Sequence, residues 1–375
     1  MRAVILGGGI GGLAAAIALR RVGVESLVLE QAPAIREVGA GLSLWSNAVV
    51  ALRELGVEEK VVACGSVFET FSSRTSSGRP IAESNFANLA REAGAPCVCI
   101  HRAVLQRILL DELDPASVRT GTRCICFEDS TAILESGERI EADFLIGADG
   151  INSVIRRQLH GEEAPRYEGA TCWRGICDPS ELLPARTSLL VLGPGTQFGA
   201  VPCGSGLVYW FLAKNAPRGT VQTKADALAA CHDWAAPVLD FIQATPEEAV
   251  LQNDIVDRKP LKAWGRGRVT LLGDSAHAST PNLGQGACQA IEDAVTLADC
   301  VRGNPNIEQA LRTYERQRIS RTTMIVNDSW RAGQLLQTER PLLAAFRDWF
   351  SVSSIGQRIQ SRMFKKLLLH RVPKL

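Results

Sequence analysis

An α/β fold with an inserted antiparallel sheet and a helical C-terminal region is predicted from three observations. Four short, largely apolar runs are each followed by a glycine or an acidic residue, as expected of buried parallel strands: 3–6, 26–29, 142–146 and 269–272. Residues 166–264 alternate strand-like segments with Gly and Pro turns, which is typical of an antiparallel sheet. Apolar spacing after residue 306 predicts helices. The 375 residues, 46% of them hydrophobic, can bury a sizeable core in about two domains.

The first 30 residues predict a dinucleotide-binding βαβ unit. Gly7, Gly9 and Gly12 form a G-x-G-x-x-G turn between the first strand and an alanine-rich helical segment. In such a unit the first glycine allows the tight turn, the second lets a pyrophosphate approach the backbone, and the third lets the helix lie close to the sheet. Glu30 ends the second strand about 20 residues later, where an acid can accept hydrogen bonds from an adenosine ribose.

Acidic residues also follow the third and fourth predicted strands. Asp149 lies in the sequence GADG, and Asp274 follows the strand that ends in LLG. Because open α/β sheets bind ligands at the carboxyl ends of their strands, both side chains are expected at the edge that holds the glycine turn. Gly284 and Gly286 mark the start of the next helix, whose first amides are free to bind an anion.

Three residues between these motifs are further candidates. Gly41 lies in a stretch of small residues, where the backbone could approach a ligand. Arg36 is either a solvated loop charge or a contact to the cofactor. Arg102 opens a predicted helix at a position where the helix dipole does not favour a cation, which indicates a positional reason for it.

Composition excludes several classes of partner. The net charge is +1, so no global field attracts nucleic acid. The eleven cysteines are odd in number and include no C-x-x-C pair, and we interpret them as buried thiols, not as metal ligands or disulfides. No metal site is therefore predicted, and a cytoplasmic, reducing compartment is expected.

Two segments differ in character from the rest. Residues 67–100 are rich in polar and turn-forming residues, and we expect an irregular insertion into another domain. Residues 349–375 contain no acidic residue and six cations on an amphipathic pattern. This tail is either a helix with its basic edge in solvent or a weak membrane-surface contact.

Three motifs, taken in order, give the chain a family resemblance. GGGIGG with Glu30, then GADGINSVIR, then LLGDSAHASTPNLGQGACQAIEDA together resemble the class A flavoprotein monooxygenases with the p-hydroxybenzoate hydroxylase fold. Within that family the chain is similar to salicylate hydroxylase, urate hydroxylase and zeaxanthin epoxidase. The resemblance implies a Rossmann-like FAD-binding domain (GR2 type), an inserted antiparallel-sheet substrate domain and C-terminal helices. The expected boundaries are 1–67, 100–165 and 262–300 for the first, 68–99 and 166–261 for the second, and 301–375 for the third.

The resemblance also implies roles for individual residues. Gly7, Gly9 and Gly12 would bind the FAD pyrophosphate, and Glu30 the ribose. The other expected cofactor contacts are the ribityl and phosphate region for Arg102, FAD and the nicotinamide cofactor for Asp149, and a ribityl hydroxyl for Asp274. The segment from Pro281 through Gly284 and Gly286 to Ala287 would run along the isoalloxazine. Cys288 stands where family members often carry Asn, so a flavin hydrogen bond is in question there.

The implied activity is insertion of one oxygen atom from O2 into an aromatic or heteroaromatic small molecule. NADPH or NADH would reduce the FAD, and a C4a-hydroperoxyflavin would transfer the oxygen. Arg174 and Tyr209 are candidates to orient a phenolate or carboxylate and, with Pro281, are the expected catalytic residues; Arg174 could equally be a surface cation. His277, inside a motif, is interpreted as a structural hydrogen-bonding residue. No second G-x-G-x-x-G is present, which disfavours a separate nicotinamide domain.

Two alternatives stay open at this point. The first is an epoxidase or hydroxylase of a lipophilic isoprenoid or polyketide, which the basic tail favours because such a substrate dissolves in membranes. The second is a non-catalytic FAD-binding redox sensor, whose NAD(P)H oxidation no small molecule would accelerate.

Overall fold

The computed structural model describes residues 1–35, 40–178 and 180–375, and its first layer is a five-stranded parallel sheet. The strand order is β18-β12-β1-β2-β8. The strands are β1 (Arg2–Leu6), β2 (Glu25–Leu29), β8 (Val118–Arg119), β12 (Phe144–Gly147) and β18 (Val269–Leu271). Their near-continuous apolar character follows from burial on both faces. The predicted α/β class is confirmed.

Helices cover this sheet closely. The helix α1 (Ile10–Arg21) is buried along most of its length and packs against α10 (Gly286–Val301). Ala14, Ala15, Ala16 and Ala18 are small enough for this approach, and all four are fully buried. The part of the molecule that contains this sheet also includes α2 (Ser46–Glu54), α3 (Glu58–Cys64), α5 (Arg102–Asp111), α6 (Val154–His160) and α9 (Asp274–His277).

The second layer is a seven-stranded sheet with the order β17-β13-β16-β15-β14-β5-β6. Its strands are β5 (Thr70–Thr75), β6 (Pro80–Asn85), β13 (Arg166–Cys177), β14 (Thr187–Gly193), β15 (Thr196–Pro202), β16 (Val208–Asn215) and β17 (Leu251–Asp257). All neighbours pair antiparallel except β5 and β14. The expectation that 67–100 is irregular is therefore wrong, because β5 pairs with β14, more than a hundred residues downstream, and β6 pairs with β5.

Alternation along these strands separates two faces. Trp173, Phe198 and Trp210 point to one face, where they form a core with α7 (Lys224–Ala230) and α8 (Val238–Gln243). Arg174 and Tyr209, being one residue out of phase, point to the opposite face. That opposite face meets the small sheet β3-β7-β4, because the Tyr209 side chain packs directly on Gly41. This junction positions the candidate substrate site.

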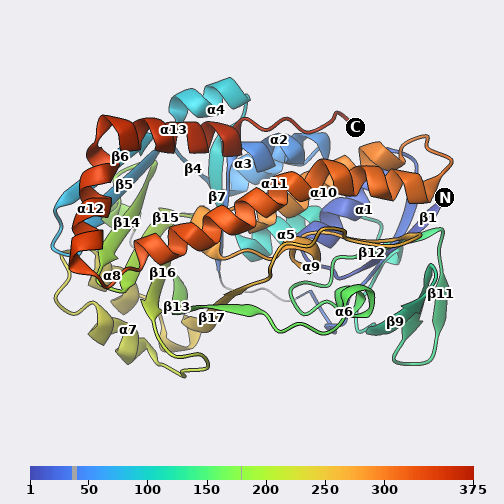
Figure 1. Ribbon diagram of the computed structural model, residues 1–375, viewed down its shortest axis with the longest axis horizontal. Coiled ribbons are helices and arrows are strands. Elements are labelled where there is room, and N and C mark those ends of the chain that lie inside the picture. The colour runs from blue at the N-terminus through green and yellow to red at the C-terminus, as the bar shows by residue number, and fades with distance from the viewer. Residues whose placement is uncertain (36–39, 179) are drawn as a thin grey trace.

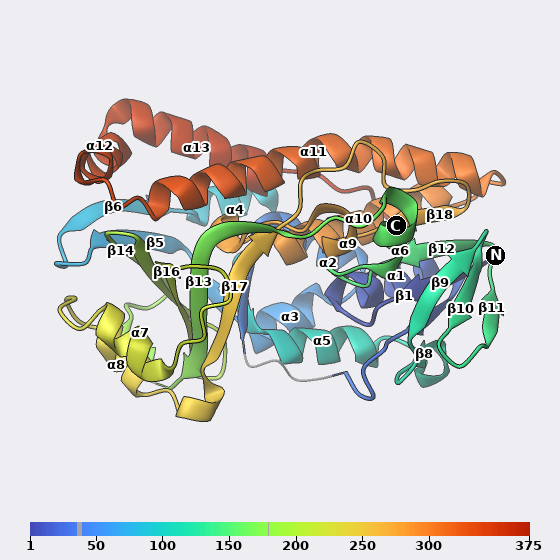
Figure 2. The same ribbon diagram turned by 60° about the horizontal axis from the view of Figure 1, so that its bottom comes forward.

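The remaining elements complete the two ends of the molecule. The small sheet consists of β3 (Gly41–Leu44), β4 (Ser66–Phe68) and β7 (Cys97–His101), with α4 (Ala87–Ala93) before β7. A three-stranded sheet of β9 (Cys124–Glu128), β10 (Thr131–Leu134) and β11 (Arg139–Glu141) lies at the far end from the seven-stranded sheet (Figures 1 and 2). Four 3-10 turns are η1 (Pro115–Ser117), η2 (Ser180–Leu182), η3 (Glu247–Ala249) and η4 (Pro281–Leu283).

Three C-terminal helices run along one edge of the molecule (Figure 2). They are α11 (Ile307–Leu336), α12 (Pro341–Val352) and α13 (Ser354–Leu368). With 30 residues, α11 is about 45 Å long, enough to reach from the parallel sheet to the seven-stranded one. None of the helices in the described part of the chain is long and apolar enough to cross a membrane.

Candidate functional site

The glycine turn after β1 is built for close backbone approach. Gly7 has φ +110°, a left-handed conformation, and a Cβ there would clash with the carbonyl oxygen of Ala148. A Cβ on Gly12 would clash with the carbonyl oxygen of Gly7, which explains how α1 starts so near the sheet. At Gly9 a Cβ would meet no atom within 4 Å, so this residue borders open space. Gln106, which the sequence analysis missed, fixes the turn by donating from Nε2 to the Gly8 carbonyl oxygen at 2.9 Å.

A cavity of about 480 Å³ lies at the carboxyl ends of β1, β2 and β12. Its lining includes Gly7, Gly9, Glu30, Asp149 and Gly150, so four of the predicted cofactor residues are brought together. The Glu30 carboxylate accepts the amides of Gly8 at 2.7 Å and Ala32 at 2.8 Å. A carboxylate has about four acceptor positions, so Glu30 is held in orientation and still able to accept ribose hydroxyls. The cavity and the unobstructed Gly9 fit the nucleotide half of FAD.

The turns that follow β12 and β18 are joined through Ser275. Asp149 accepts the Val154 amide at 2.7 Å, and its other carboxylate oxygen accepts the Ser275 hydroxyl at 3.2 Å. The same Ser275 oxygen accepts the Gly150 amide at 3.0 Å. Burial raises the pKa of the Asp149 carboxyl above its ordinary value. The two acidic motifs therefore form one rigid corner beside the cavity.

The predicted ribityl ligand Asp274 is the first residue of α9, and it lies close to the start of α10. Its side chain is exposed, and within the described residues it makes no hydrogen bond or ion pair. Its carboxylate is 4.0 Å from the position of a Cβ on Gly286. Asp293 holds the turn between β18 and α9 in place. Its carboxylate accepts a hydrogen bond from the Gly273 amide at 3.0 Å and lies 2.6 Å from Nε2 of His277. The Asp274 carboxylate is thus able to accept hydrogen bonds from a ligand. The His277 side chain instead makes a structural contact with Asp293.

Two adjacent buried acids connect α10 to α11. Burial alone would raise the pKa of Glu292, but Arg318 and Arg321 lower it well below its usual range. Arg318 contacts Glu292 at 2.7 Å and Asp293 at 2.6 Å. Burial likewise opposes the Asp293 charge, and His277 with Arg318 lowers the pKa of that carboxyl. Asn47 donates to Glu292 at 2.6 Å and to Gln285 at 3.1 Å, so this buried ion network is linked to the start of α10, where the flavin ring is expected.

The segment from η4 to the first turn of α10 provides donors without acceptors. The amides of Gly286 and Ala287 belong to the first helical turn and lack intrahelical partners. Trp45 Nε1 and Gln285 Nε2 are buried and have no acceptor among the described residues. The indole nitrogen of Trp45 is 2.9 Å from the position of a Cβ on Gly284. Such unpaired buried donors fit a ring system rich in acceptor atoms, as the isoalloxazine is.

Cys288, at the position where family members often carry Asn, is fully buried. Its thiol lies 3.6 Å from the carbonyl oxygen of Gly284 and 3.8 Å from that of Ser43. Burial raises the pKa of the Cys288 thiol to about 12, so it stays protonated. Cys288 therefore supports the backbone of the segment.

Arg174 and Tyr209 lie on one face of the seven-stranded sheet, as β13 and β16 pair there. In the described residues Arg174 has no carboxylate partner; the pKa of its guanidinium is raised chiefly by the nearby Cys172 thiol and further by Tyr209, while burial lowers it. Burial raises the pKa of the Tyr209 phenol well above its ordinary value, so the hydroxyl is neutral. A partly buried guanidinium without a counter-anion, beside a neutral phenol, is suited to hold an anionic or polarised oxygen.

A third polar group was missed by the sequence analysis. Asn282 in η4 donates to the Glu168 carboxylate at 2.7 Å and accepts from Gln197 Nε2 at 3.1 Å. Burial raises the pKa of Glu168 to about 7, and its second oxygen has no partner. Glu168 carries no recognisable motif, so its place beside η4 follows from tertiary structure alone. Pro281, the adjacent predicted residue, is exposed.

The remaining predicted residues are placed as follows. Gly41 is needed for the packing of Tyr209, since a Cβ there would overlap that ring. Arg102 is exposed at the start of α5, and its amide donates to the Ala40 carbonyl oxygen at 2.9 Å. Arg36 lies outside the described residues. The contacts of these three with a cofactor stay predictions.

A cavity at the carboxyl edge of a parallel sheet, a segment with unpaired donors at the start of α10 and a second sheet facing that segment are the arrangement expected of a flavin-dependent hydroxylase. The chain belongs to the FAD binding domain family, whose model matches residues 1–329.

Relatives agree with this assignment. Aurachin C monooxygenase/isomerase of Stigmatella aurantiaca is 38% identical over 371 residues, 97% of both chains. FAD-dependent urate hydroxylase of Klebsiella pneumoniae subsp. pneumoniae is 34% identical over 337 residues, 87% of this chain and 88% of that protein. The crystal structure of Klebsiella pneumoniae HpxO complexed with FAD and uric acid matches with TM-score 0.93 at 31% identity, over 98% of this chain and 97% of the other. The chain is thus an enzyme, an FAD-dependent class A monooxygenase.

Proposed function

We propose that this monooxygenase hydroxylates an aromatic or heteroaromatic small molecule that carries an acidic hydroxyl, lactam or carboxylate group. The observation that carries the proposal is Arg174, which has no carboxylate partner in the described residues and lies beside Tyr209 on the face toward the flavin segment. An unpaired, partly buried cation favours a substrate that brings its own negative charge. The match to a structure that holds uric acid supports the same substrate class.

Bound FAD would supply the chemistry, by passing electrons from NADPH or NADH to dioxygen. The chain's own residues bind, orient and exclude water. Gly7, Gly9 and Glu30 would hold the nucleotide half, and Asp274 a ribityl hydroxyl. The free amides at Gly286 and Ala287 would stabilise negative charge on the ring without reorganising, since that turn is already linked to the buried ion network.

Arg174 and Tyr209 would place the substrate carbon toward the ring. A neutral Tyr209 donates a hydrogen bond to the substrate oxygen, and Arg174 stabilises the deprotonated form of the substrate, whose ring is more electron-rich than that of the neutral form. Oriented binding of this kind lowers the barrier because the reacting atoms are held together before reaction.

The test is a screen of phenols, benzoates, quinolones and purines, uric acid included. Purified protein reconstituted with FAD is expected to oxidise NADPH or NADH faster with a true substrate, and the product mass should rise by one oxygen. Epoxidation of a lipophilic isoprenoid or polyketide is the competing outcome. NAD(P)H oxidation that no compound accelerates would favour a redox sensor.

Two statements on location belong to the same proposal. We place the protein in the cytoplasm, because the eleven cysteines are free thiols and most are buried. We also propose weak contact of the basic C-terminal tail with a membrane surface, because residues 349–375 carry six cations and no acid.

A further inference from the structure

The helix α12 has its polar and apolar sides reversed relative to an ordinary surface helix. Arg347 points inward, 6% exposed, where it pairs with Asp348 at 2.8 Å and donates to the Leu336 carbonyl oxygen at 2.9 Å. Leu342 and Trp349 point outward and are 87% and 63% exposed. A surface helix normally buries its apolar stripe and exposes its charges. The orientation of α12 therefore indicates a surface that something else covers.

Exposed apolar side chains are concentrated on α12 and the beginning of α13. Seven of the twelve large apolar side chains exposed in the described residues fall within 342–359, and the rest are scattered over the molecule. We call these seven the C-terminal apolar face: Leu342, Leu343, Phe346, Trp349, Val352, Ile355 and Ile359. Contiguous apolar patches on soluble proteins mark sites of association.

Cations border this face on α13. Arg358, Arg362 and Lys366 are exposed, and none pairs with an acidic residue that the structure describes. Lys365 approaches Glu92 at 4.0 Å. A symmetric dimer formed through this face would pair it with its own copy, and residues 349–375 contain no acid to neutralise these cations, whereas an anionic lipid surface would neutralise them. The charge pattern thus selects the membrane.

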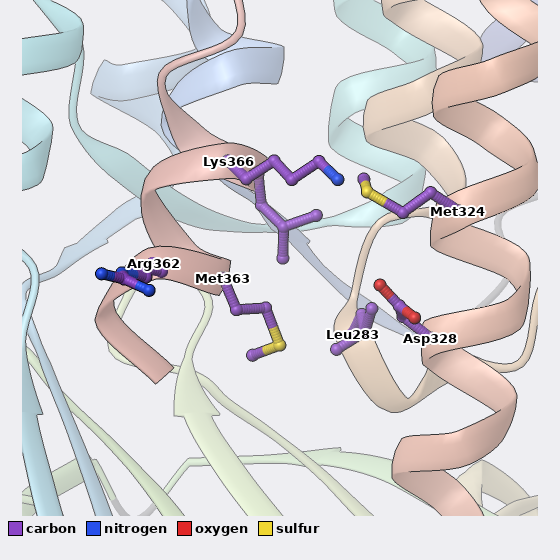
Figure 3. Close-up of a pocket in the computed structure, with 7 residues that line it drawn as sticks. Leu283, Met324, Asp328, Arg362, Met363 and Lys366 are labelled. Carbon is purple, nitrogen blue, oxygen red and sulfur yellow. The ribbon is translucent and has the colours of Figure 1, made fainter. Parts of the chain in front are cut away.

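A recess adjoins the cationic border. A cavity of about 180 Å³ lies between α11 and α13; its lining includes the apolar Leu283, Met324 and Met363 and the charged Asp328, Arg362 and Lys366 (Figure 3). Leu283 belongs to η4, next to Gly284 of the flavin segment. The recess therefore lies between the cations of α13 and the turn η4.

We propose that α12 and α13 form a membrane-docking platform, in which the C-terminal apolar face inserts among lipid headgroups and the α13 cations bind anionic lipid. This deepens, and rests on, the proposed tail contact; it does not depend on the oxygen chemistry. Both helices lie at the outer edge of the molecule, clear of the parallel sheet (Figures 1 and 2). A helix with aromatic and aliphatic residues on one side and cations beside them is typical of interfacial binding.

The test uses full-length protein reconstituted with FAD and co-sedimented with vesicles of phosphatidylcholine, alone or with phosphatidylglycerol. Binding is expected to the anionic vesicles and to weaken at high salt. The double variant Phe346→Ser/Trp349→Ser should lower affinity by roughly 10-fold or more. The triple variant Arg358→Gln/Arg362→Gln/Lys366→Gln should lower it by about 100-fold.

Val221→Ser is the matched control, because Val221 is 90% exposed in a loop distant from α12 in the chain; its vesicle binding should equal that of the wild type. FAD content of each variant reports on folding, and bulk NAD(P)H oxidation reports on the proposed activity independently of binding. The proposal is overturned if the wild type fails to bind, if it binds both vesicle types equally, or if the control loses binding too. A dimer in light scattering that Phe346→Ser/Trp349→Ser makes monomeric would assign the face to a second copy instead.

Discussion

Asn282 donates a hydrogen bond to Glu168 at 2.7 Å, which links η4 beside the candidate flavin site to β13 of the seven-stranded sheet. The same amide side chain accepts from Gln197 on β15, so the flavin segment is tied to two strands of the sheet that carries Arg174 and Tyr209. The two halves of the site are held together by this polar contact. Burial raises the pKa of Glu168 to about 7, so the charge of its carboxyl group changes near neutral pH.

Glu168→Gln should change the pH dependence of stability. The pKa of Glu168 rises from 4.5 to about 7 in the folded protein, chiefly through burial. Below pH 4.5 the residue is protonated in both states and costs nothing. As the pH rises toward 7 the unfolded chain loses this proton first, so folding is destabilised, by up to about 3 kcal/mol above pH 7. Gln keeps an acceptor for Asn282. The unfolding temperature of the variant should rise relative to that of the wild type as the pH increases from 5 to 8. A difference in unfolding temperature that does not change with pH would contradict this account.

Gly9→Val should separate folding from cofactor binding. Because nothing lies within 4 Å of a Cβ at this position, the side chain can be accommodated, and the change in unfolding temperature should be a few degrees at most. The isopropyl group would project toward the phosphates, so FAD affinity should fall about 100-fold or more. Ala225→Val, at an exposed position of α7 beside the seven-stranded sheet, is the control for FAD binding. FAD retained at wild-type affinity in Gly9→Val would remove Gly9 from the site.

Arg318→Met should destabilise the protein strongly. The substitution would remove the guanidinium that pairs with the buried carboxylates of Glu292 and Asp293. Breaking a buried ion pair in this way lowers the free energy of unfolding by roughly 3–5 kcal/mol. Arg331→Met, where the side chain is 78% exposed, should cost less than about 0.5 kcal/mol. Denaturant titration compares the two. Equal effects would mean that the network does not carry the stability assigned to it.

Arg174→Gln should weaken binding of an acidic substrate and uncouple the reaction. Losing one charge-assisted hydrogen bond corresponds to an increase in KM of roughly 10- to 100-fold, with NAD(P)H oxidation then yielding hydrogen peroxide in place of product. Arg218→Gln, an exposed cation in the loop after β16, serves as the control. Unchanged KM and coupling in Arg174→Gln would assign the residue a structural role.

Sequence predicted what depends on local pattern. The turn Gly7 to Gly12 and Glu30 belong to one continuous βαβ unit, so their spacing predicted that they lie together, as they do around the cavity at the carboxyl edge of the sheet. Asp149 and Asp274 followed from the rule that parallel strands share a carboxyl edge.

Residues whose role depends on distant partners could not be found in this way. Glu168 meets Asn282 across 114 positions, and Gln106 reaches Gly8 across 98. The polar sequence of 70–85 predicted turns. It forms strands because β5 pairs with the distant strand β14, which sequence alone does not reveal. The reversal of α12 is visible only once burial is known, since its apolar spacing is that of any amphipathic helix.

The most direct test of monooxygenase function is to run the reaction of a substrate found in the screen under heavy-isotope dioxygen in ordinary water. The account predicts that each product molecule carries one labelled oxygen atom and that one NAD(P)H is consumed for each. Product oxygen derived from water, or NAD(P)H oxidation with no oxygenated product from any compound, would contradict it.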